Sequence, residues 1–589
     1  MNKMMKKDNL TWIAIKTGLL SGVIAIFLCL IGMVEVFSKR DVVEKIITLG
    51  DFILLATAVS AGVIAARAAS QTDQQRQPLK FLFAGALAGI TTGVLIAAFI
   101  GLSQQINLRS VFLSASPSLF NLLTFKGGTS WIWMYPAIGI AAGLLGTTLF
   151  LLPEKFRQPI TRAIFITFLM ALFSGLFRVV MINQSSGIAK LAKYLFGQTG
   201  LTLSGAIIFF VAVVAISMFW SARSKNLQEG FARIPKRGQT SIRVVVFALL
   251  AYVVLMLPQV SGPFIAQVIV IVSLYALMGL GLNITLGFAG LLDLGFVAFF
   301  AVGAYTVGLL TSYGIFGLQH IPFWVAAPIA VLVSMMFGAF LGLPVLGIRG
   351  DYLAIATLGF GEIVRLLAGS DFLAPFFGGP QGIIGIQKPC LGTLGEFIRV
   401  DVPRVCNGLE FAGPKEIYYL AVASAILVAF IALRLQRSRL GRAWMAIRED
   451  EDVAEALGIN LIQTKLLAYM LGAAFAGLGG AIFTVLVGSI FATSMQLIVS
   501  INVVALIIVG GMGSIPGVIV GAIALIGMPE LLREVSEYRF LFYGAALIMM
   551  MLAKPEGLWP SQATLRELHH EDAGEDSEIA PAKSSQAKA

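Results

Sequence analysis

The chain has 589 residues, of which 58% are hydrophobic and 12% are charged, and its formal net charge is +11. Soluble domains have about 45–50% apolar and about 25% charged residues, so this composition, with a mean hydropathy of +0.89, excludes an ordinary soluble protein. The basic residues lie at the ends of apolar runs, which is typical of loops retained in the cytoplasm and excludes a nucleic-acid-binding face.

Apolar stretches of about 20 residues recur along the chain, and each is long enough to cross a hydrocarbon core of ~30 Å as a helix. The strands of a membrane barrel would instead alternate apolar and polar residues. The sequence therefore predicts an all-α, polytopic transmembrane helical bundle of about 16 spans, with about six in the N-terminal part and about ten in the remainder.

Residues 1–220 are predicted to form an N-terminal extension that starts in the cytoplasm. The first apolar run begins like a signal peptide, but it is long and no small-residue cleavage site follows, so we interpret it as the first span. The extension is expected to pack around the core or to hold a further subunit. Its predicted spans are 11–33, 46–66, 81–101, 131–152, 163–182 and 201–220.

Residues 221–243 contain six Lys or Arg residues and one Glu, which predicts a cytoplasmic linker and the main domain boundary. Residues 244–562 are predicted to form the core. Residues 563–589 are polar and lack aromatic residues, which favours a disordered cytoplasmic tail. The predicted spans of the core are 244–260, 264–287, 293–312, 323–346, 352–369, 417–434, 465–488, 495–512, 516–532 and 538–554.

Several spans carry small residues four positions apart, a spacing that lets helix backbones approach closely. Gly85, Gly89 and Gly93 follow this spacing in one span, and Gly139 and Gly143 follow it in another. We expect these glycines to pack helices together within the chain, and a subunit interface is the alternative.

The stretch "LGFAGLLDLGF" (286–296) places three glycines and one carboxylate between two apolar runs with almost no loop. Glycine costs about 1 kcal/mol in a helix interior, so the stretch favours a broken helix near the membrane edge, and such helices often lie beside translocation routes. The alternative is a tight turn with a surface Asp. The candidate path residues here are Asn283, Gly290 and Asp293.

A second intramembrane charge is predicted in "GIRGDYLAIATLGFGEIVRLL" (347–367). If a span begins near Asp351, Glu362 lies about 16 Å into it, close to the midplane. Arg365 follows on the same helix face, so the two side chains can pair. Charges inside a membrane are functional candidates by default, and a structural ion pair is the alternative.

The outer loop that follows contains "FFGGPQGI" (376–383), where Gly378 and Gly379 predict a sharp turn near the external mouth of a path. Cys390 and Cys406 lie further along this loop and are candidates for a disulfide in an oxidising compartment. No histidine lies near them, which disfavours a metal site.

The most polar segment between spans is "GRAWMAIREDEDVAEALGIN" (441–460), which charge and parity place in the cytoplasm. Two short helices fit it: one over about 440–448, and one with Asp450 as N-cap that ends at Gly458. An apolar patch suited to docking in a groove of another protein is predicted from Trp444, Ile447, Val453 and Leu457.

Two alternatives exist for this polar segment. It can be a solvated connection between spans, or "REDED" can hold Mg²⁺ and a diphosphate as in intramembrane prenyltransferases. That chemistry needs a second acidic motif, which the sequence lacks. No G-x-x-x-x-G-K-[ST] motif occurs either, so ATP-driven transport would need its ATPase, with ATP and Mg²⁺, on other chains.

Residues from about 244 to 562 resemble the integral-membrane permease of bacterial branched-chain amino acid ABC transporters, in the longer of its two permease types. The matching stretches occur in family order. They are "LGLNITLGFAGLLDLGFVAFFAVGAYT" (280–306), "RGDYLAIATLGFGEIVRLL" (349–367), "GGPQGI" (378–383), "SRLGRAWMAIREDEDVAEALGINLIQTKLLAY" (438–469), "VGGMGSIPG" (509–517) and "PELLREVSEYRFLFYGAALIMMMLAKPEGLWP" (529–560).

The resemblance implies a non-enzymatic transport subunit in the bacterial inner membrane, and the loop charges and the polar tail place both termini in the cytoplasm. It implies a path shared with a second homologous permease, two ABC ATPase subunits and an external solute-binding protein, and no cofactor on this chain. Residues 435–464 would be the loop that couples to the ATPase, in which Trp444 and Ile447 would pack into its groove. The implied coupling residues are Gly441, Arg442, Trp444, Ile447, Glu449, Asp450, Glu455 and Gly458.

The sequence departs from the family pattern before "VGGMGSIPG". The family often has a Ser-Pro-Glu segment and a membrane-embedded acid there, whereas here Asn502 stands near the position of that acid. Asn502 is a further candidate path residue, and the departure makes urea or short amides the alternative substrates to branched-chain amino acids. There are two alternatives of a different class. One is an ion-coupled secondary transporter, which would need several membrane-embedded acids. The other is a structural subunit of a larger complex.

Overall fold

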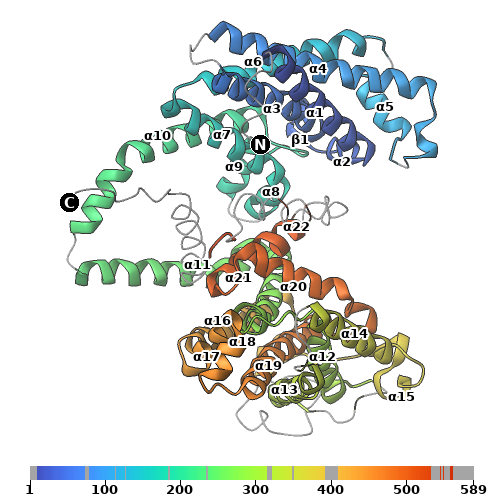
Figure 1. The fold of residues 1–589 in the computed structure, drawn as a ribbon, viewed down its shortest axis with the longest axis vertical. Helices are drawn as coiled ribbons and strands as arrows, with labels where there is room; N and C mark the ends of the chain where they lie inside the picture. The colour runs from blue at the N-terminus through green and yellow to red at the C-terminus, as the bar shows by residue number, and fades with distance from the viewer. Residues whose placement is uncertain are drawn as a thin grey trace, which may run out of the picture. The chain divides into compact units, whose positions relative to one another are not determined.

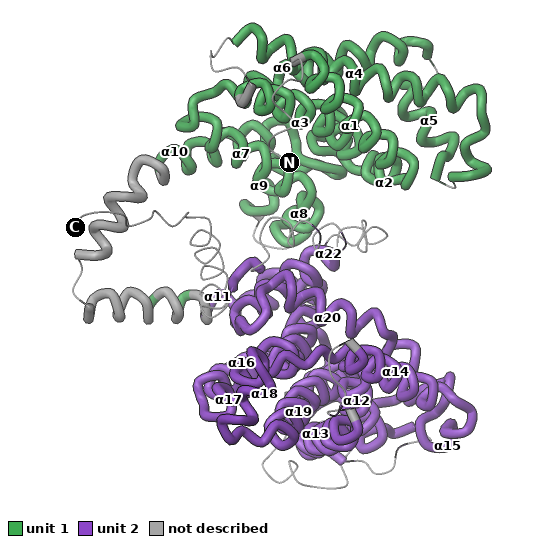
Figure 2. Tube along the Cα trace, viewed as in Figure 1, with its two compact units in different colours: residues 1–249 green, residues 250–589 purple. Residues whose placement is uncertain are grey.

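A computed structural model of the chain describes most of its residues (Figure 1). The described residues are 10–72, 78–112, 114–125, 128–182, 186–233, 236–314, 317, 321–345, 347, 351–391, 409–531, 544, 548 and 557–560. The contacts divide the chain into two compact units, residues 1–249 and 250–589, shown in green and purple in Figure 2. This division falls close to the boundary that the basic segment 221–243 predicts.

The first unit is almost entirely helical, with one small antiparallel pair of strands. Its elements are α1 (Leu10–Leu30), α2 (Met33–Phe37), β1 (Asp41–Val43), β2 (Ile47–Thr48), α3 (Leu49–Thr72), α4 (Pro78–Gln105), η1 (Leu108–Ser110), α5 (Pro117–Leu123), α6 (Trp131–Leu151), α7 (Glu154–Leu172), α8 (Ser174–Ile182), α9 (Ser186–Leu195) and α10 (Leu203–Arg233).

Glycines bring α4 and α6 into backbone contact. A Cβ built on Gly89 would lie 2.0 Å from the carbonyl oxygen of Gly139, and one built on Gly143 would lie 2.1 Å from the carbonyl oxygen of Gly85. Any side chain at these positions would push the helices apart. The prediction that this glycine spacing serves packing within the chain is confirmed.

The second unit is also helical, and its three-dimensional arrangement is built around α19. Its elements are α11 (Lys236–Leu282), η2 (Asn283–Phe288), α12 (Val297–Thr311), α13 (Phe323–Val345), α14 (Asp351–Ala368), α15 (Ala374–Phe377), η3 (Gly379–Gln381), β3 (Ile383–Ile384), β4 (Cys390–Leu391), β5 (Leu409–Glu410), α16 (Pro414–Gln436), α17 (Arg439–Glu449), α18 (Glu451–Ala456), α19 (Leu461–Val487), β6 (Ser489–Ile490), η4 (Ala492–Ser494), α20 (Leu497–Gly510), α21 (Ile515–Ala522), η5 (Ile523–Gly527) and α22 (Met528–Leu531).

The helices α12 and α13 pack on α19 through small residues. A Cβ built on Gly480 of α19 would lie 2.0 Å from the carbonyl oxygen of Phe300, and one on Gly303 would lie 2.3 Å from that of Gly477. Outside α19, β3 pairs antiparallel with β6, and β4 pairs antiparallel with β5. The core of the second unit is therefore a close-packed helical layer with short strand pairs at one end.

Replacing Gly480 by Leu is expected to lower the free energy of unfolding by at least about 1–3 kcal/mol, because the new side chain meets the Phe300 backbone rather than a movable side chain. Gly359 of α14 is the matched control, since nothing lies within 4 Å of a Cβ built there. Gly359→Ala should leave the thermal unfolding temperature in detergent unchanged or raise it. Equal unfolding temperatures for Gly480→Leu and the wild type would contradict this packing.

The helix α11 joins two runs that were predicted as separate spans, 244–260 and 264–287. The two parts meet at Gly262, whose φ of 85° and ψ of 178° are not helical, and Pro263 follows. Proline removes a backbone donor and clashes with the preceding turn, so the helix kinks here without a loop. The apolar part, Tyr252–Phe288, has 37 residues, or about 55 Å of helix, which exceeds a straight crossing of ~30 Å.

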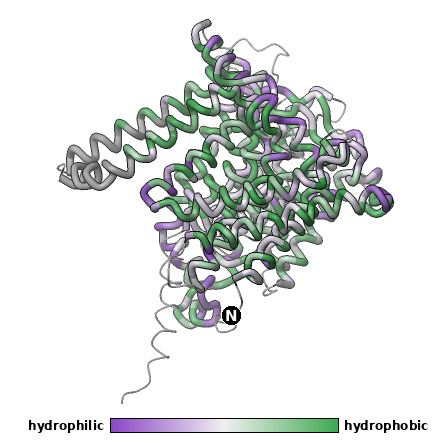
Figure 3. Tube along the Cα trace, turned by 90° about the horizontal axis from the view of Figure 1, so that it is seen from above, coloured by the Kyte–Doolittle hydropathy of each residue, from purple (hydrophilic) through white to green (hydrophobic). Residues whose placement is uncertain are grey.

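Within the described residues, nine helices are long and apolar enough to cross a membrane, or ten with the pair α7 and α8, which bends by 61° at its break. Figure 3 shows hydrophobic residues along most helices, and many large ones are exposed, as for a lipid-facing surface. The all-α polytopic bundle is confirmed, but about 16 spans are not. Several predicted spans form shorter helices, such as Val297–Thr311, and 538–554 lies almost entirely outside the described residues.

Candidate functional site

The polar segment after α16 folds into the two short helices that its sequence predicts, α17 and α18. The Ser438 side chain caps α17 by accepting the Gly441 N–H at 3.2 Å. The Asp450 carboxylate caps α18 by accepting two backbone N–H groups at 2.9 and 3.0 Å. Gly458 follows with a φ of 86°, a conformation that favours glycine. The predicted N-cap and the predicted end of this segment are confirmed.

The prediction of an apolar docking patch is wrong for Trp444 and Ile447, because both side chains are buried. Trp444 and Ile447 are 0% and 2% exposed, and the Trp444 indole N–H donates to the Thr464 carbonyl oxygen at 2.8 Å. Both residues therefore fasten α17 to this chain instead of projecting toward a partner. The reason is physical, since a buried indole gains apolar contacts and the start of α19 supplies an acceptor for its N–H. The exposed apolar residues of the segment are Val453 and Leu457.

Two charged contacts hold this segment in place. Lys465 of α19, which is only 4% exposed, pairs with Glu451 of α18 at 2.5 Å. Arg448 of α17 donates to the carbonyl oxygen of Gly287 at 2.8 Å. Gly290, with a φ of 72°, leaves room for this arginine, because a Cβ there would lie 3.0 Å from its Cγ. The end of α17 is thus bonded to the interruption in the long helix.

The stretch between α11 and α12 is a broken helix, which is the first of the two structures that its sequence favours. The chain leaves α11 through the π-helical turn η2 and then runs without helix until Val297. The Asn283 side-chain oxygen accepts the Gly513 N–H at 2.9 Å, and a Cβ on Gly287 would collide with this amide. Asp293 is 1% exposed, so the alternative of a surface Asp in a tight turn is wrong.

The turn between α20 and α21 completes this arrangement. The Gln436 amide at the end of α16 donates to the Gly513 carbonyl oxygen at 3.3 Å. Residues 557–560 lie on the same turn, where the Leu558 and Trp559 N–H groups donate to the carbonyl oxygens of Val509 and Gly510 at 2.8 and 2.9 Å. We call this meeting point the coupling junction, defined by Asn283, Gly287, Gln436, Arg448 and Gly513.

Asp293 lies in the connection between η2 and α12. Its Oδ1 atom accepts the Gly295 N–H at 2.9 Å, while its Oδ2 atom is buried with no hydrogen-bond partner among the described residues. A buried carboxylate oxygen without a partner is costly, which keeps Asp293 a functional candidate.

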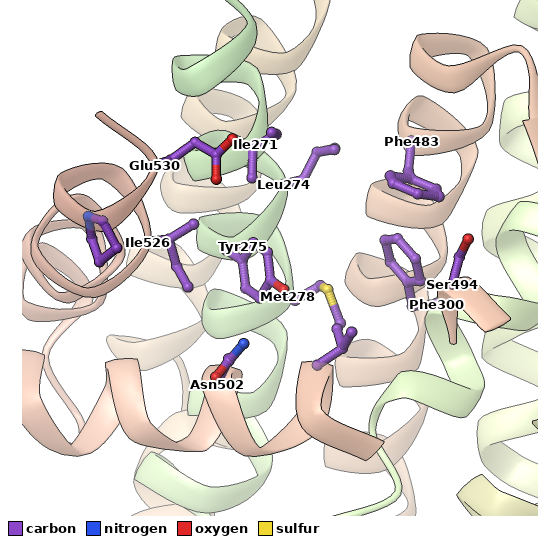
Figure 4. A pocket seen from close by; sticks show the side chains of 12 residues that line it. Ile271, Leu274, Tyr275, Met278, Phe300, Phe483, Ser494, Asn502, Ile526 and Glu530 are labelled. Atoms are coloured by element: carbon purple, nitrogen blue, oxygen red, sulfur yellow. The ribbon is translucent and has the colours of Figure 1, made fainter. Parts of the chain in front are cut away.

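A cavity of about 260 Å³ lies between helices of the second unit (Figure 4). Most of its wall is apolar, and Glu530, Asn502 and Ser494 supply the polar side chains of the described wall together with the Tyr275 hydroxyl. The full lining is Ile271, Leu274, Tyr275, Met278, Phe300, Phe483, Ser494, Val499, Asn502, Ile526, Pro529 and Glu530. Of the candidate path residues, only Asn502 reaches this cavity.

The other candidate path residues are spread over the unit. Glu362 and Arg365 pair within α14, where the Arg365 Nε atom lies 3.0 Å from each carboxylate oxygen, so the predicted pairing is confirmed. Their side chains are 39% and 28% exposed on this chain. Gly378 and Gly379 adopt φ of 75° and 52° at the turn after α15, as the predicted sharp turn requires.

The structure describes one of the two cysteines of the predicted disulfide. Cys390 is disulfide-bonded, and Cys406 lies outside the described residues, so the bond between these two stays a prediction. Within the described ranges no group of His, Cys, Asp and Glu side chains could hold a metal ion.

Sequence reasoning missed the roles of Arg448 and Glu530. Arg448 and Gly287 are 161 residues apart, and neither residue type indicates that the two residues are in contact. Glu530 belongs to the quoted stretch 529–560, but only the fold turns it into a cavity in which every other described side chain is uncharged. The available signal was the cost of a carboxylate in an apolar run, which marks a functional candidate.

The chain is similar to known permeases over its second half. The family model for the permease component of the branched-chain amino acid transport system matches residues 264–553. The high-affinity branched-chain amino acid transport system permease protein LivM of Escherichia coli (strain K12) is 40% identical over 322 residues, which cover 52% of this chain and 74% of that protein. For LivM of Salmonella typhimurium the identity is 42% over 296 residues, covering 49% and 68%.

A second type of permease is similar to this chain with lower identity. The high-affinity branched-chain amino acid transport system permease protein LivH of Escherichia coli (strain K12) is 27% identical over 278 residues, which cover 43% of this chain and 89% of that protein. No solved structure matches this chain. With its multiple apolar helices and these matches, the chain is a multi-pass membrane protein that belongs to the family of branched-chain amino acid transport system permease components.

Proposed function

We propose that this chain is a permease subunit of an ATP-driven importer for branched-chain and other hydrophobic amino acids. The observation that carries the proposal is the family match over residues 264–553, which include both the coupling junction and the cavity, together with the 40% identity to LivM of Escherichia coli. The similarity to LivH supports a homologous permease as the partner with which the path is formed. The chain itself would hold no nucleotide and perform no covalent chemistry.

Two further partners belong to the proposal. A solute-binding protein would deliver substrate from outside, and two ATPase subunits carrying ATP and Mg²⁺ would bind at the segment 435–464. The exposed side chains of α17 and α18 support this docking, because Arg442, Glu449, Asp450 and Glu455 are exposed in the same segment as the apolar Val453 and Leu457. Exposed apolar side chains together with polar ones are typical of protein interfaces. Both termini would then lie in the cytoplasm.

The first test is purification of the tagged chain from its native membrane in mild detergent, followed by mass spectrometry and reconstitution. We expect ATPase chains and a second permease to copurify, and leucine uptake into liposomes to require ATP and the binding protein. Competition by urea and short amides measures the alternative substrates. A chain that purifies alone and drives uptake with an ion gradient would contradict the proposal.

Docking at α17 and α18 has its own test. Arg442→Ala and Glu455→Ala should each reduce copurification of the ATPase and the coupling of ATP hydrolysis to uptake, while the amount of chain in the membrane stays unchanged. Full copurification and full coupling in both variants would show that the ATPase binds elsewhere.

A further inference from the structure

The cavity of Figure 4 contains a carboxylate that has no partner among the described residues. Glu530 of α22 is half-buried, and within the part of the chain that the structure describes no hydrogen bond or ion pair engages its side chain. A charge in an apolar setting is costly unless another group compensates it. The cavity therefore leaves a place for a ligand that carries a positive charge.

A second polar side chain, Asn502, lines the same cavity. The amide of Asn502 on α20, also half-buried, makes no hydrogen bond with any described residue. An amide supplies two N–H donors as well as one acceptor, so it can bind a carboxylate that lies beside a cation. One acid and one neutral amide together match a zwitterion better than a simple cation or anion.

The remaining wall determines what else the ligand carries. In Figure 4 the rings of Phe300 and Phe483 lie across the cavity from Glu530, with Met278 of α11 between. These side chains offer an apolar and partly aromatic surface, to which a hydrocarbon side chain binds favourably. The polar and apolar groups are thus placed apart, as an amphipathic ligand requires.

We propose that this cavity binds the amino acid in transit, with the ammonium group on the Glu530 carboxylate and the apolar side chain toward Met278, Phe300 and Phe483. The Asn502 amide donates to the substrate carboxylate. The inference rests on the proposed function and assigns to it a substrate site on this chain. Because the described wall contains a single carboxylate, a zwitterionic monoamine fits, whereas a divalent metal ion would lack ligands.

The test uses the copurified transporter in liposomes and labelled leucine. Glu530→Gln should lower leucine uptake at least about tenfold, because it removes one partner of a half-buried charge pair, while ATP hydrolysis stimulated by the binding protein continues. The double variant Glu530→Gln with Asn502→Asp, which moves the acid to another wall of the cavity, should recover part of the uptake. Glu154→Gln, at an exposed carboxylate of the first unit, is the matched control and should not change uptake.

A labelling measurement keeps the proposal testable if Glu530→Gln fails to assemble. Ser494 lines the cavity and is partly exposed, so a cysteine placed there should react with N-ethylmaleimide, after subtraction of the wild-type background. Leucine, isoleucine and valine should slow the reaction, and glutamate should not.

The outcomes separate this inference from the proposed function. If the wild-type transporter takes up no amino acid, the proposed function fails. If it takes up leucine but Glu530→Gln stays within about twofold of it, or if leucine leaves labelling at Ser494→Cys unchanged, the cavity is not the substrate site and the proposed function stands.

Discussion

Replacing Arg448 by Ala is expected to separate ATP hydrolysis from uptake in the assembled transporter. Uptake should fall at least about tenfold, since a charge-assisted hydrogen bond contributes about 1.5–3 kcal/mol, while ATP hydrolysis continues. The guanidinium of Arg448 bonds the end of α17 to the Gly287 carbonyl oxygen in η2. A movement that an ATPase imposes on α17 would reach the broken helix through this bond.

The chain offers two matched variants for this prediction. Arg448→Lys keeps one donor that can reach the Gly287 carbonyl, so it should retain part of the coupling. Arg109→Ala removes an exposed arginine of the first unit, outside the segment 435–464, and should leave coupling unchanged. Tight coupling in Arg448→Ala, with uptake equal to that of Arg109→Ala, would show that the bond at Gly287 does not transmit the movement.

The second large effect is expected for Trp444→Ala, which should destabilise the second unit by about 3–5 kcal/mol. The indole is fully buried, and its loss would leave a cavity and remove the donor to the Thr464 carbonyl oxygen. Trp444→Phe keeps most of the apolar volume and loses mainly the hydrogen bond, which contributes about 1 kcal/mol. The measurement is the thermal unfolding temperature in detergent, with hydrogen exchange over residues 437–460.

This variant also distinguishes the two placements of Trp444. If the residue fastens α17 to its own chain, Trp444→Ala should increase hydrogen exchange in α17 and α18 even without an ATPase. An unchanged unfolding temperature and unchanged exchange, combined with lost copurification of the ATPase, would support the interface contact that the sequence predicts for this tryptophan.

In the proposed mechanism the coupling junction receives the movement of the ATPase and the cavity binds the substrate, and both regions belong to the second unit. Asn283 and Gly513 connect the broken helix to the turn that begins α21, and α21 continues through η5 to Glu530 in α22. The α20–α21 turn thus belongs both to the junction and to the chain segment that carries the acid of the cavity. We expect Asn283→Ala to alter uptake without changing ATPase copurification, as measured in the same assays.

Features that depend on residues close together in the chain follow from the sequence. The caps at Ser438 and Asp450 and the end at Gly458 involve groups only a few residues apart, so their residue types are sufficient to predict α17 and α18. Apolar runs likewise predict membrane helices, and the ordered motifs from 280 to 560 predict the family that the comparisons show.

Which faces of those elements are buried, and what they meet, depends on the tertiary fold. Hydropathy measures the length of an apolar run but does not show that the chain kinks at Gly262 or bends by 61° between α7 and α8, and the prediction of about 16 spans is not confirmed. Trp444 is buried because α19 presents an acceptor to it, and Arg448 meets Gly287 because two distant segments pack together. Such contacts join residues far apart in the chain, where local composition carries no information about the partner.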